Sequence, residues 1–297
     1  MGVEIKVLDL GDIELESSFL VLGHDCGLSI QVPVFGFLIL GGEAPVLVDT
    51  GFSRPEIMGN LGMKGFYRGD QGLDKQLARH GLDKSDVRWI LHTHLHIDHA
   101  GKDSEFSMDE TTVVINRREL EYSVSGIMGE QYPADYVKHL VDRLHHRGAL
   151  RLLDLELSGR DEVMPGVWCE AAGGHTEGSM NVFVETDEGI ACICGDVIYD
   201  IVNQVIHPFL QVMDLDAAVT GNQGTSKRQE KAAIRRVINS ARFVLPVHDR
   251  PAVLERGRVI GRLFDRVPGP LVENDTFPGP LTGAWEQAGL APAAAAT

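Results

Sequence analysis

Short apolar runs bounded by turn residues fill the first half of the chain, a pattern typical of β-strands. The predicted strands are Val32–Leu40, Pro45–Asp49, Arg88–Thr93 and Thr112–Ile115. Between them, Leu73, Leu77 and Leu82 follow helical spacing, and the helix is expected to stop at Gly81.

The second half of the chain repeats this alternation. Strands are expected at Val167–Ala171, Met180–Glu185, Gly189–Cys194 and Arg242–Val247, and helices at Ser226–Asn239 and Val253–Phe264. Strand runs interleaved with single helices, twice over, predict two sheets packed face to face with helices on the outside.

Length and composition favour one large domain, because 297 residues of which 43% are hydrophobic can bury a sizeable core. From about Val267 the chain becomes rich in Pro and Gly, and it ends in a run of alanines. We therefore predict a domain over residues 1–266 and an extended arm over residues 267–297, partly disordered at its end.

The charge balance narrows the range of partners. With 27 basic and 43 acidic residues, the formal net charge is -16, which repels nucleic acids and anionic membranes. The N-terminal residues do not resemble a signal peptide, and no run is long enough to span a membrane. Four cysteines without paired spacing indicate reduced thiols, so a cytoplasmic protein acting on a small molecule is expected. The sequence leaves open a homodimer or a hetero-oligomer.

Four potential metal ligands fall within six residues, directly after the predicted strand that ends near Thr93. They are His94, His96, Asp98 and His99. Imidazole nitrogens and carboxylate oxygens are the ligands that zinc prefers, and a loop at a strand end can direct them toward two neighbouring points. One segment can therefore supply ligands to two metal ions.

Three further candidates follow the ends of later predicted strands. His175 comes after the turn Gly173–Gly174, Asp196 follows Gly195, and His248 follows Val247. Ligands at the ends of neighbouring strands share one rim of a sandwich, so these residues are expected to join the first cluster.

With these motifs, the sequence resembles the metallo-β-lactamase superfamily from about residue 34 to residue 253, and most closely its N-acyl-homoserine lactonase branch. The resemblance implies an αββα sandwich of two mixed β-sheets with helices on both outer faces, forming a catalytic domain. It also implies that two zinc ions, replaceable by iron or manganese, are held by His94, His96 and His175, by Asp98, His99 and His248, and by a bridging Asp196. Asp49, in the segment Val48–Gly51, is expected to brace the histidine loop from behind the ligands.

The resemblance also implies a mechanism. A hydroxide shared by the two zinc ions would attack a lactone or ester carbonyl. Tyr199, three residues after Asp196, would donate a hydrogen bond to the carbonyl oxygen as charge develops there. Asp98 would then pass a proton to the departing alkoxide.

Departures from the lactonase pattern concern the walls of the site rather than its metals. Glu177 stands where the family usually has proline, and Lys102–Asp103 replaces a usual Gly-Asn. Substrate contacts are expected from Ile97 and from two segments, 52–70 with Met58, Phe66 and Tyr67, and 127–136.

Two other functions stay open on the sequence. One is a two-zinc hydrolase of activated aryl esters, aryl ethers, phosphotriesters or thioesters, because the same hydroxide serves all of these substrates. For thioesters of glutathione, basic residues are expected in the C-terminal part, which contains Arg250, Arg256, Arg258 and Arg262. The other is a non-catalytic subunit that retained the fold, although a complete ligand set argues against it.

Overall fold

The computed structural model describes residues 3–208, 216–222 and 224–262. The predicted arm over residues 267–297, and its boundary at residue 266, lie outside these residues. Among the helices of the described ranges, none is long and apolar enough to cross a membrane.

Two seven-stranded sheets form the centre of the described part of the molecule. The first sheet has the order β4-β1-β2-β3-β5-β6-β7, and the second has the order β14-β13-β12-β11-β10-β9-β8. The strands of the first are β1 (Glu4–Glu16), β2 (Ser29–Leu40), β3 (Val46–Val48), β4 (Lys64–Phe66), β5 (Trp89–Leu91), β6 (Thr112–Asn116) and β7 (Leu150–Leu153). Those of the second are β8 (Arg160–Met164), β9 (Val167–Ala171), β10 (Met180–Thr186), β11 (Gly189–Gly195), β12 (Phe243–Pro246), β13 (Ala252–Glu255) and β14 (Arg258–Arg262).

Both sheets are mixed. In the first, β1, β2 and β3 run antiparallel, whereas β3, β5, β6 and β7 run parallel. In the second, only the β11–β12 pair is parallel among the described strands. Several strands therefore point their carboxyl ends toward one rim, where ligands of open sheets collect.

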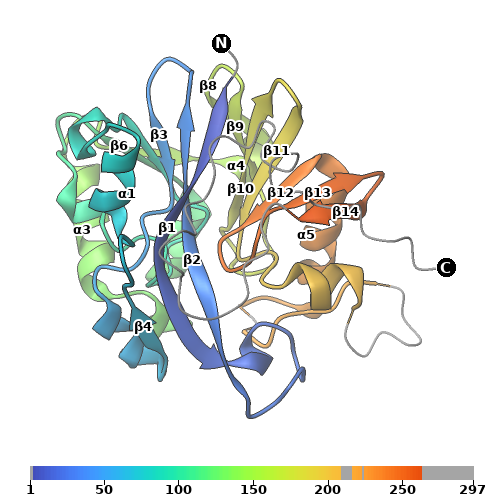
Figure 1. Ribbon diagram of the computed structural model, residues 1–297. Coiled ribbons are helices and arrows are strands. Elements are labelled where there is room, and N and C mark those ends of the chain that lie inside the picture. The colour runs from blue at the N-terminus through green and yellow to red at the C-terminus, as the bar shows by residue number, and fades with distance from the viewer. Residues whose placement is uncertain (1–2, 209–215, 223, 263–297) are drawn as a thin grey trace.

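Helices cover the outer faces of the two sheets (Figure 1). In Figure 1, α1 and α3 lie on the side of the first sheet and α5 on the side of the second. The helices are α1 (Leu73–Arg79), α2 (Arg117–Ser123), α3 (Ala134–Leu144), α4 (Leu155–Ser158) and α5 (Lys227–Ser240). Short 3-10 segments are η1 (Ser17–Phe19), η2 (Pro55–Leu61), η3 (Lys84–Asp86), η4 (Asp103–Glu105) and η5 (Gly129–Gln131), and η6 (Val202–Ile206) is a π-helical turn. The predicted αββα sandwich is confirmed.

The predicted helix at Val253–Phe264 is wrong over its described residues. The chain there forms the antiparallel strands β13 and β14. Arg256 and Gly257, at the turn between them, have φ angles of 52° and 75°, in the left-handed region that a tight hairpin requires. The β-branched residues on both sides of this turn favour strands. The spacing of the apolar residues alone does not distinguish a helix from a strand here.

The long strand β1 was not expected from the sequence. Its apolar positions are interrupted by Asp9 and Asp12, which are nevertheless buried. The side-chain amide of Gln71 donates to a carboxylate oxygen of each, at 3.0 Å in both cases. Hydrogen bonds from a distant residue therefore offset the free-energy cost of burying these acids. The local sequence does not reveal such a partner.

Candidate metal centre

Strand ends from both sheets position the predicted ligands. The His94–His99 loop follows β5, and His175, Asp196 and His248 follow β9, β11 and β12. Gly195, at the end of β11, has φ 51°, and a Cβ atom there would lie 2.5 Å from Thr93 Oγ1. Glycine therefore lets β11 approach the histidine loop closely enough for Asp196 to reach it.

The seven predicted ligands form two neighbouring groups, within each of which the ligand atoms lie within 4.8 Å of one another. One group is His94, His96, His175 and Asp196, and the other is Asp98, His99 and His248. All seven residues are buried, with Asp98 the most exposed at 8%. The structure thus brings together the two sets in the grouping that the resemblance implied, with Asp196 placed beside the first.

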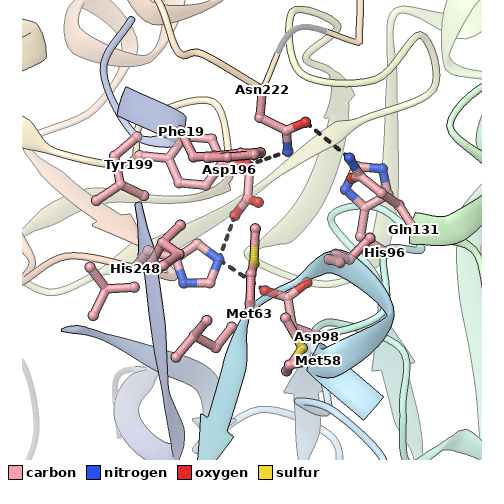
Figure 2. A pocket seen from close by; sticks show the side chains of 15 residues that line it. Phe19, Met58, Met63, His96, Asp98, Gln131, Asp196, Tyr199, Asn222 and His248 are labelled. Atoms are coloured by element: carbon pink, nitrogen blue, oxygen red, sulfur yellow. Dashed lines mark hydrogen bonds and ion pairs between the residues drawn. The ribbon is translucent and has the colours of Figure 1, made fainter. Parts of the chain in front are cut away.

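Asp196 faces both groups. Its Oδ2 lies 3.7 Å from His94 Nε2 and 3.5 Å from His175 Nε2. Its Oδ1 lies 3.2 Å from His99 Nε2 and 3.4 Å from His248 Nε2. Figure 2 shows His248 joined to both Asp196 and Asp98. One carboxylate therefore presents one oxygen to each group, as a bridging ligand does.

Hydrogen bonds behind the ligands fix the orientation of two imidazole rings. Asp49 Oδ2 lies 2.9 Å from His99 Nδ1, and the carbonyl oxygen of Pro33 lies 2.9 Å from His248 Nδ1. Each Nδ1–H donates to its oxygen, so each Nε2 is left to face the centre. Asp49 also accepts from the backbone and hydroxyl of Thr93, and its own φ of 57° turns it back onto the loop. Its position agrees with the predicted bracing role.

Unpartnered polar atoms show that this donor set fits metal ions. Buried polar atoms normally have hydrogen-bond partners. In the described part of the chain, the buried side-chain atoms without one include Nε2 of His94, His96 and His99 and Oδ1 of Asp196. His99 Nε2 and Asp196 Oδ1 are close but lack hydrogen-bond geometry. A zinc-like cation would bind such unpaired nitrogen and oxygen atoms as its ligands.

Protonation differs between the two groups in the metal-free protein. Burial, followed by repulsion between neighbouring imidazoles, holds the pKa values of His94 and His96 well below the usual range. Burial also lowers the pKa of His248, but the Asp196 and Asp98 carboxylates outweigh it and raise this pKa to about 10. Asp196 and Asp98 likewise raise the pKa of His99 against the effect of its burial.

Zinc binding is therefore expected to release protons and to tighten as pH rises. Because Asp196 and Asp98 raise the pKa values of His99 and His248, a metal that binds these nitrogens competes with protons. Affinity should rise with pH until these groups are deprotonated. Calorimetry in buffers of different ionisation enthalpy should detect at least about one proton released per protein at pH 7. A buffer-independent binding enthalpy would contradict this assignment.

Glu119, on α2, ties two ligand loops together and was not predicted from the sequence. Its Oε1 accepts from the Leu95 backbone at 3.0 Å and from the Tyr132 hydroxyl at 3.0 Å, and its Oε2 accepts from the Thr176 hydroxyl at 2.6 Å. Leu95 lies between two ligands and Thr176 follows His175. Burial raises the pKa of Glu119 in spite of these donors. The carboxyl thus fastens the His94–His99 loop to the His175 turn.

Replacement of Glu119 by alanine is expected to destabilise the metal-free protein by about 2–4 kcal/mol, because buried donors lose their acceptor. Zinc affinity should fall by roughly 10- to 100-fold. Urea unfolding and competition with a zinc chelator measure the two effects. Glu121→Ala, on the same helix, is the matched control, since Glu121 is exposed and pairs with Arg118 on the surface. Equal behaviour of the two variants would remove Glu119 from the site.

Tyr199 lies at the edge of the metal centre. Its ring stacks on that of His248, with centroids 5.4 Å apart and planes 10° apart, and its Oη lies 3.5 Å from both ring nitrogens of His175. Gln204 accepts a hydrogen bond from the Tyr199 backbone at 2.7 Å. Burial, and then the charge of Asp196, raises the pKa of Tyr199 well above its usual value. The phenol therefore keeps its proton and can donate it in a hydrogen bond.

A narrow cavity of about 40 Å³ opens in front of the centre. Its apolar walls come from β1, η1, β2 and the segment around η2, and include the predicted Met58. Ile97, Phe66 and Tyr67 are not among its lining residues. Ile97 is fully buried, Phe66 lies in β4, and the Tyr67 ring packs against Phe52 with centroids 5.2 Å apart.

A second cavity, of about 430 Å³, meets the first at Leu20, Val32, Tyr199 and His248. Its lining is more polar and includes Asp12, Gln31, Asp200, Asp249 and Arg250. The metal centre thus faces an apolar wall on one side and a polar one on the other.

Comparison with known proteins identifies the family. A model of the metallo-beta-lactamase superfamily matches residues 30–248. The chain is 29% identical to the N-acyl homoserine lactonase of Bacillus cereus over 184 residues, which cover 58% of this chain and 67% of that protein. It is 28% identical to the N-acyl homoserine lactonase of Bacillus thuringiensis over 172 residues, which cover 54% of this chain and 62% of that protein. The chain therefore spans about two thirds of the length of these curated relatives.

Solved structures agree on the fold. An N-acyl homoserine lactone hydrolase with the product N-hexanoyl-L-homoserine bound at its catalytic metal centre superposes with a TM-score of 0.62 and 23% identity. The match covers 80% of this chain and 88% of that one. Since the family model covers well over half of the residues and the sheets carry the ligands at their shared rim, the chain belongs to the metallo-beta-lactamase superfamily.

Proposed function

We propose that this protein is a two-zinc lactonase that opens the ring of N-acyl homoserine lactones. The proposal rests on three supports: the family, a hydrolase family; the named activity of the curated relatives; and the donor set of the centre. The observation that carries it is the position of Asp196, whose two oxygens face the two ligand groups separately. A single shared carboxylate suits a pair of cations rather than one.

Each part of the site has a role in this proposal. His94, His96 and His175 would hold one ion, Asp98, His99 and His248 the other, and Asp196 both. When bound, the pair supplies a water of lowered pKa as nucleophile and polarises the carbonyl.

The protein's own groups do the remaining work. Tyr199 donates its phenol proton in a hydrogen bond to the carbonyl oxygen, where negative charge develops. Asp98, whose Oδ2 lies 3.3 Å from His248 Nε2, would take up the proton that the attacking water gives up and return it to the departing alkoxide. In a lactone this alkoxide stays attached, so the product is a hydroxy acid.

The cavity walls support a substrate with an apolar part. Ile13, Leu15, Val32, Leu61 and Met63 contribute to the apolar face next to the ligands. Methionine side chains adapt their shape, which suits a narrow cavity that must widen around an acyl chain. None of the four C-terminal arginines lines this cavity, and Arg262 is paired with Asp249 at 2.5 Å. Among the described residues, the basic contact that the glutathione thioester alternative expects comes from Arg250, which lines the second cavity rather than the apolar one.

A substrate panel tests the proposal. Zinc-loaded protein is incubated with N-hexanoyl homoserine lactone, 4-nitrophenyl acetate, a phosphotriester and a glutathione thioester, and each product is quantified. We expect kcat/KM for the lactone to exceed the others by at least about tenfold. Preference for another substrate would assign the protein to the alternative two-zinc hydrolases. No turnover of any of them would favour a non-catalytic subunit.

A further inference from the structure

Two side-chain amides meet beside the metal centre, and nothing in the metal-ligand set requires them. Gln131, at the end of η5, and Asn222, in the loop before α5, lie 91 residues apart in the sequence. Gln131 Nε2 donates to Asn222 Oδ1 at 2.9 Å, and both side chains line the apolar cavity. Figure 2 shows this contact, with Asn222 above Asp196 and Gln131 on the same side of the view as His96.

The contact fixes which end of the Asn222 amide faces Tyr199. Since Asn222 Oδ1 is engaged by Gln131, its Nδ2 points the other way, and it lies 3.4 Å from Tyr199 Oη. In that direction Nδ2–H donates and the phenol oxygen accepts. The phenol proton is then left to point away from Asn222, on the side where Asp196 and the ring nitrogens of His175 lie, the latter at 3.5 Å from Tyr199 Oη.

Both amides are held on rigid supports. The Asn222 backbone donates to Thr220 Oγ1 at 3.0 Å, and the Thr220 hydroxyl donates to the carbonyl oxygen of Phe19 at 2.6 Å. On the other side, the residue after Gln131 is Tyr132, whose hydroxyl is bound by Glu119 and whose ring lies 4.8 Å from that of His96. Hydrogen bonds thus tie Asn222 to η1 through Thr220, and Gln131 adjoins the Glu119 contacts that fasten the ligand loops.

We propose that Gln131 and Asn222 form a directional relay that aims the hydroxyl proton of Tyr199 at the substrate carbonyl. Both are positioning residues, because they act through Tyr199. The inference rests on the proposed function, since it needs Tyr199 to assist the reaction. A phenol hydroxyl that rotates freely points its proton away from the carbonyl for part of the time. A pre-aligned hydroxyl needs no free energy for reorientation when the reaction occurs.

Nearly isosteric, uncharged variants test the relay. Asn222→Leu and Gln131→Met keep the shape of each side chain and remove its hydrogen bonds. We expect kcat for N-hexanoyl homoserine lactone to fall about 5- to 10-fold in Asn222→Leu and less in Gln131→Met, with KM changed by less than about twofold. Zinc content should stay unchanged. Asn239→Ala, which removes an amide from the exposed end of α5, is the control for loss of a side-chain amide.

A double-mutant cycle separates the relay from a general structural effect. In a Tyr199→Phe background, Asn222→Leu should have no further effect on kcat, because the hydroxyl through which Asn222 acts is gone. Additive losses would overturn the relay. If Tyr199→Phe alone leaves kcat unchanged, the fault lies instead in the role proposed for Tyr199.

A spectroscopic readout does not depend on turnover. In the zinc-loaded protein, the side-chain NH2 resonances of Asn222, assigned by ¹⁵N labelling, should shift in Tyr199→Phe, because the phenol oxygen is their acceptor. They should also shift in Gln131→Met. If the Asn222 resonances do not shift in Tyr199→Phe, then Asn222 Oδ1 rather than Nδ2 faces the phenol. The proposed direction of the relay would then be wrong.

Discussion

An Asp196→Ala protein is expected to lose nearly all lactone hydrolysis, on the order of 1,000-fold or more in kcat, together with much of its affinity for metal. Two effects add. Both ligand groups lose a shared oxygen donor, and the bound cations would lose the negative charge that offsets their mutual repulsion. A bound metal contributes several kcal/mol to the reaction, so its displacement accounts for a loss of this size.

Zinc content after dialysis and the rate of lactone opening check this expectation together. Asp187→Ala is the matched control, because Asp187 is an exposed acid in the turn before β11, at the opposite end of that strand from Asp196. The control should retain its zinc and its rate. An Asp196→Ala protein with normal zinc and turnover would show that the ligand assignment is wrong.

Tyr199→Phe is expected to lower kcat by roughly 10- to 1,000-fold while zinc content stays intact, as for other donors to a developing oxyanion. The phenylalanine ring keeps the stacking on His248, so the change removes only the hydroxyl. Steady-state kinetics on the lactone measure the effect. A loss confined to KM would mean that the phenol binds only the ground state, and no loss at all would make Tyr199 structural.

The clustering of the seven candidate ligands could be predicted because it follows from local sequence. His94, His96, Asp98 and His99 follow one strand within six residues, and the remaining ligands each come directly after another strand. Because these strands end at one rim, their ends can be placed together without knowing how the loops fold. Asp49 was instead inferred from the family resemblance of the segment Val48–Gly51, and it lies directly after β3 beside the histidine loop.

Errors arose where local pattern and tertiary context compete. The segment Val253–Phe264 has apolar residues at a spacing that suits a helix, but Arg256 and Gly257 turn the chain into a hairpin. The strand β1 contains Asp9 and Asp12, which look like surface residues until the amide of Gln71 satisfies them. In both cases a contact or a turn conformation outweighs the hydrophobic period.

The supporting residues had no signal in the sequence. Glu119 lies in the charged run Arg117–Glu121, which is typical of a solvated helix, yet it is buried behind two ligand loops. Gln131 fell inside a segment predicted to form a pocket wall, but its partner Asn222 is 91 residues away. Contacts of this kind depend on how the loops pack, and no spacing rule encodes them.

Titration of the metal-free protein with zinc, followed by the rate of N-hexanoyl homoserine lactone opening at each addition, tests the central claim most directly. Seven ligands in two groups joined by Asp196 are more than one tetrahedral ion can use. We therefore predict that the rate rises until about two equivalents per chain are bound and then stays constant. Full activity at one equivalent, or no lactone opening at any zinc concentration, would contradict the account.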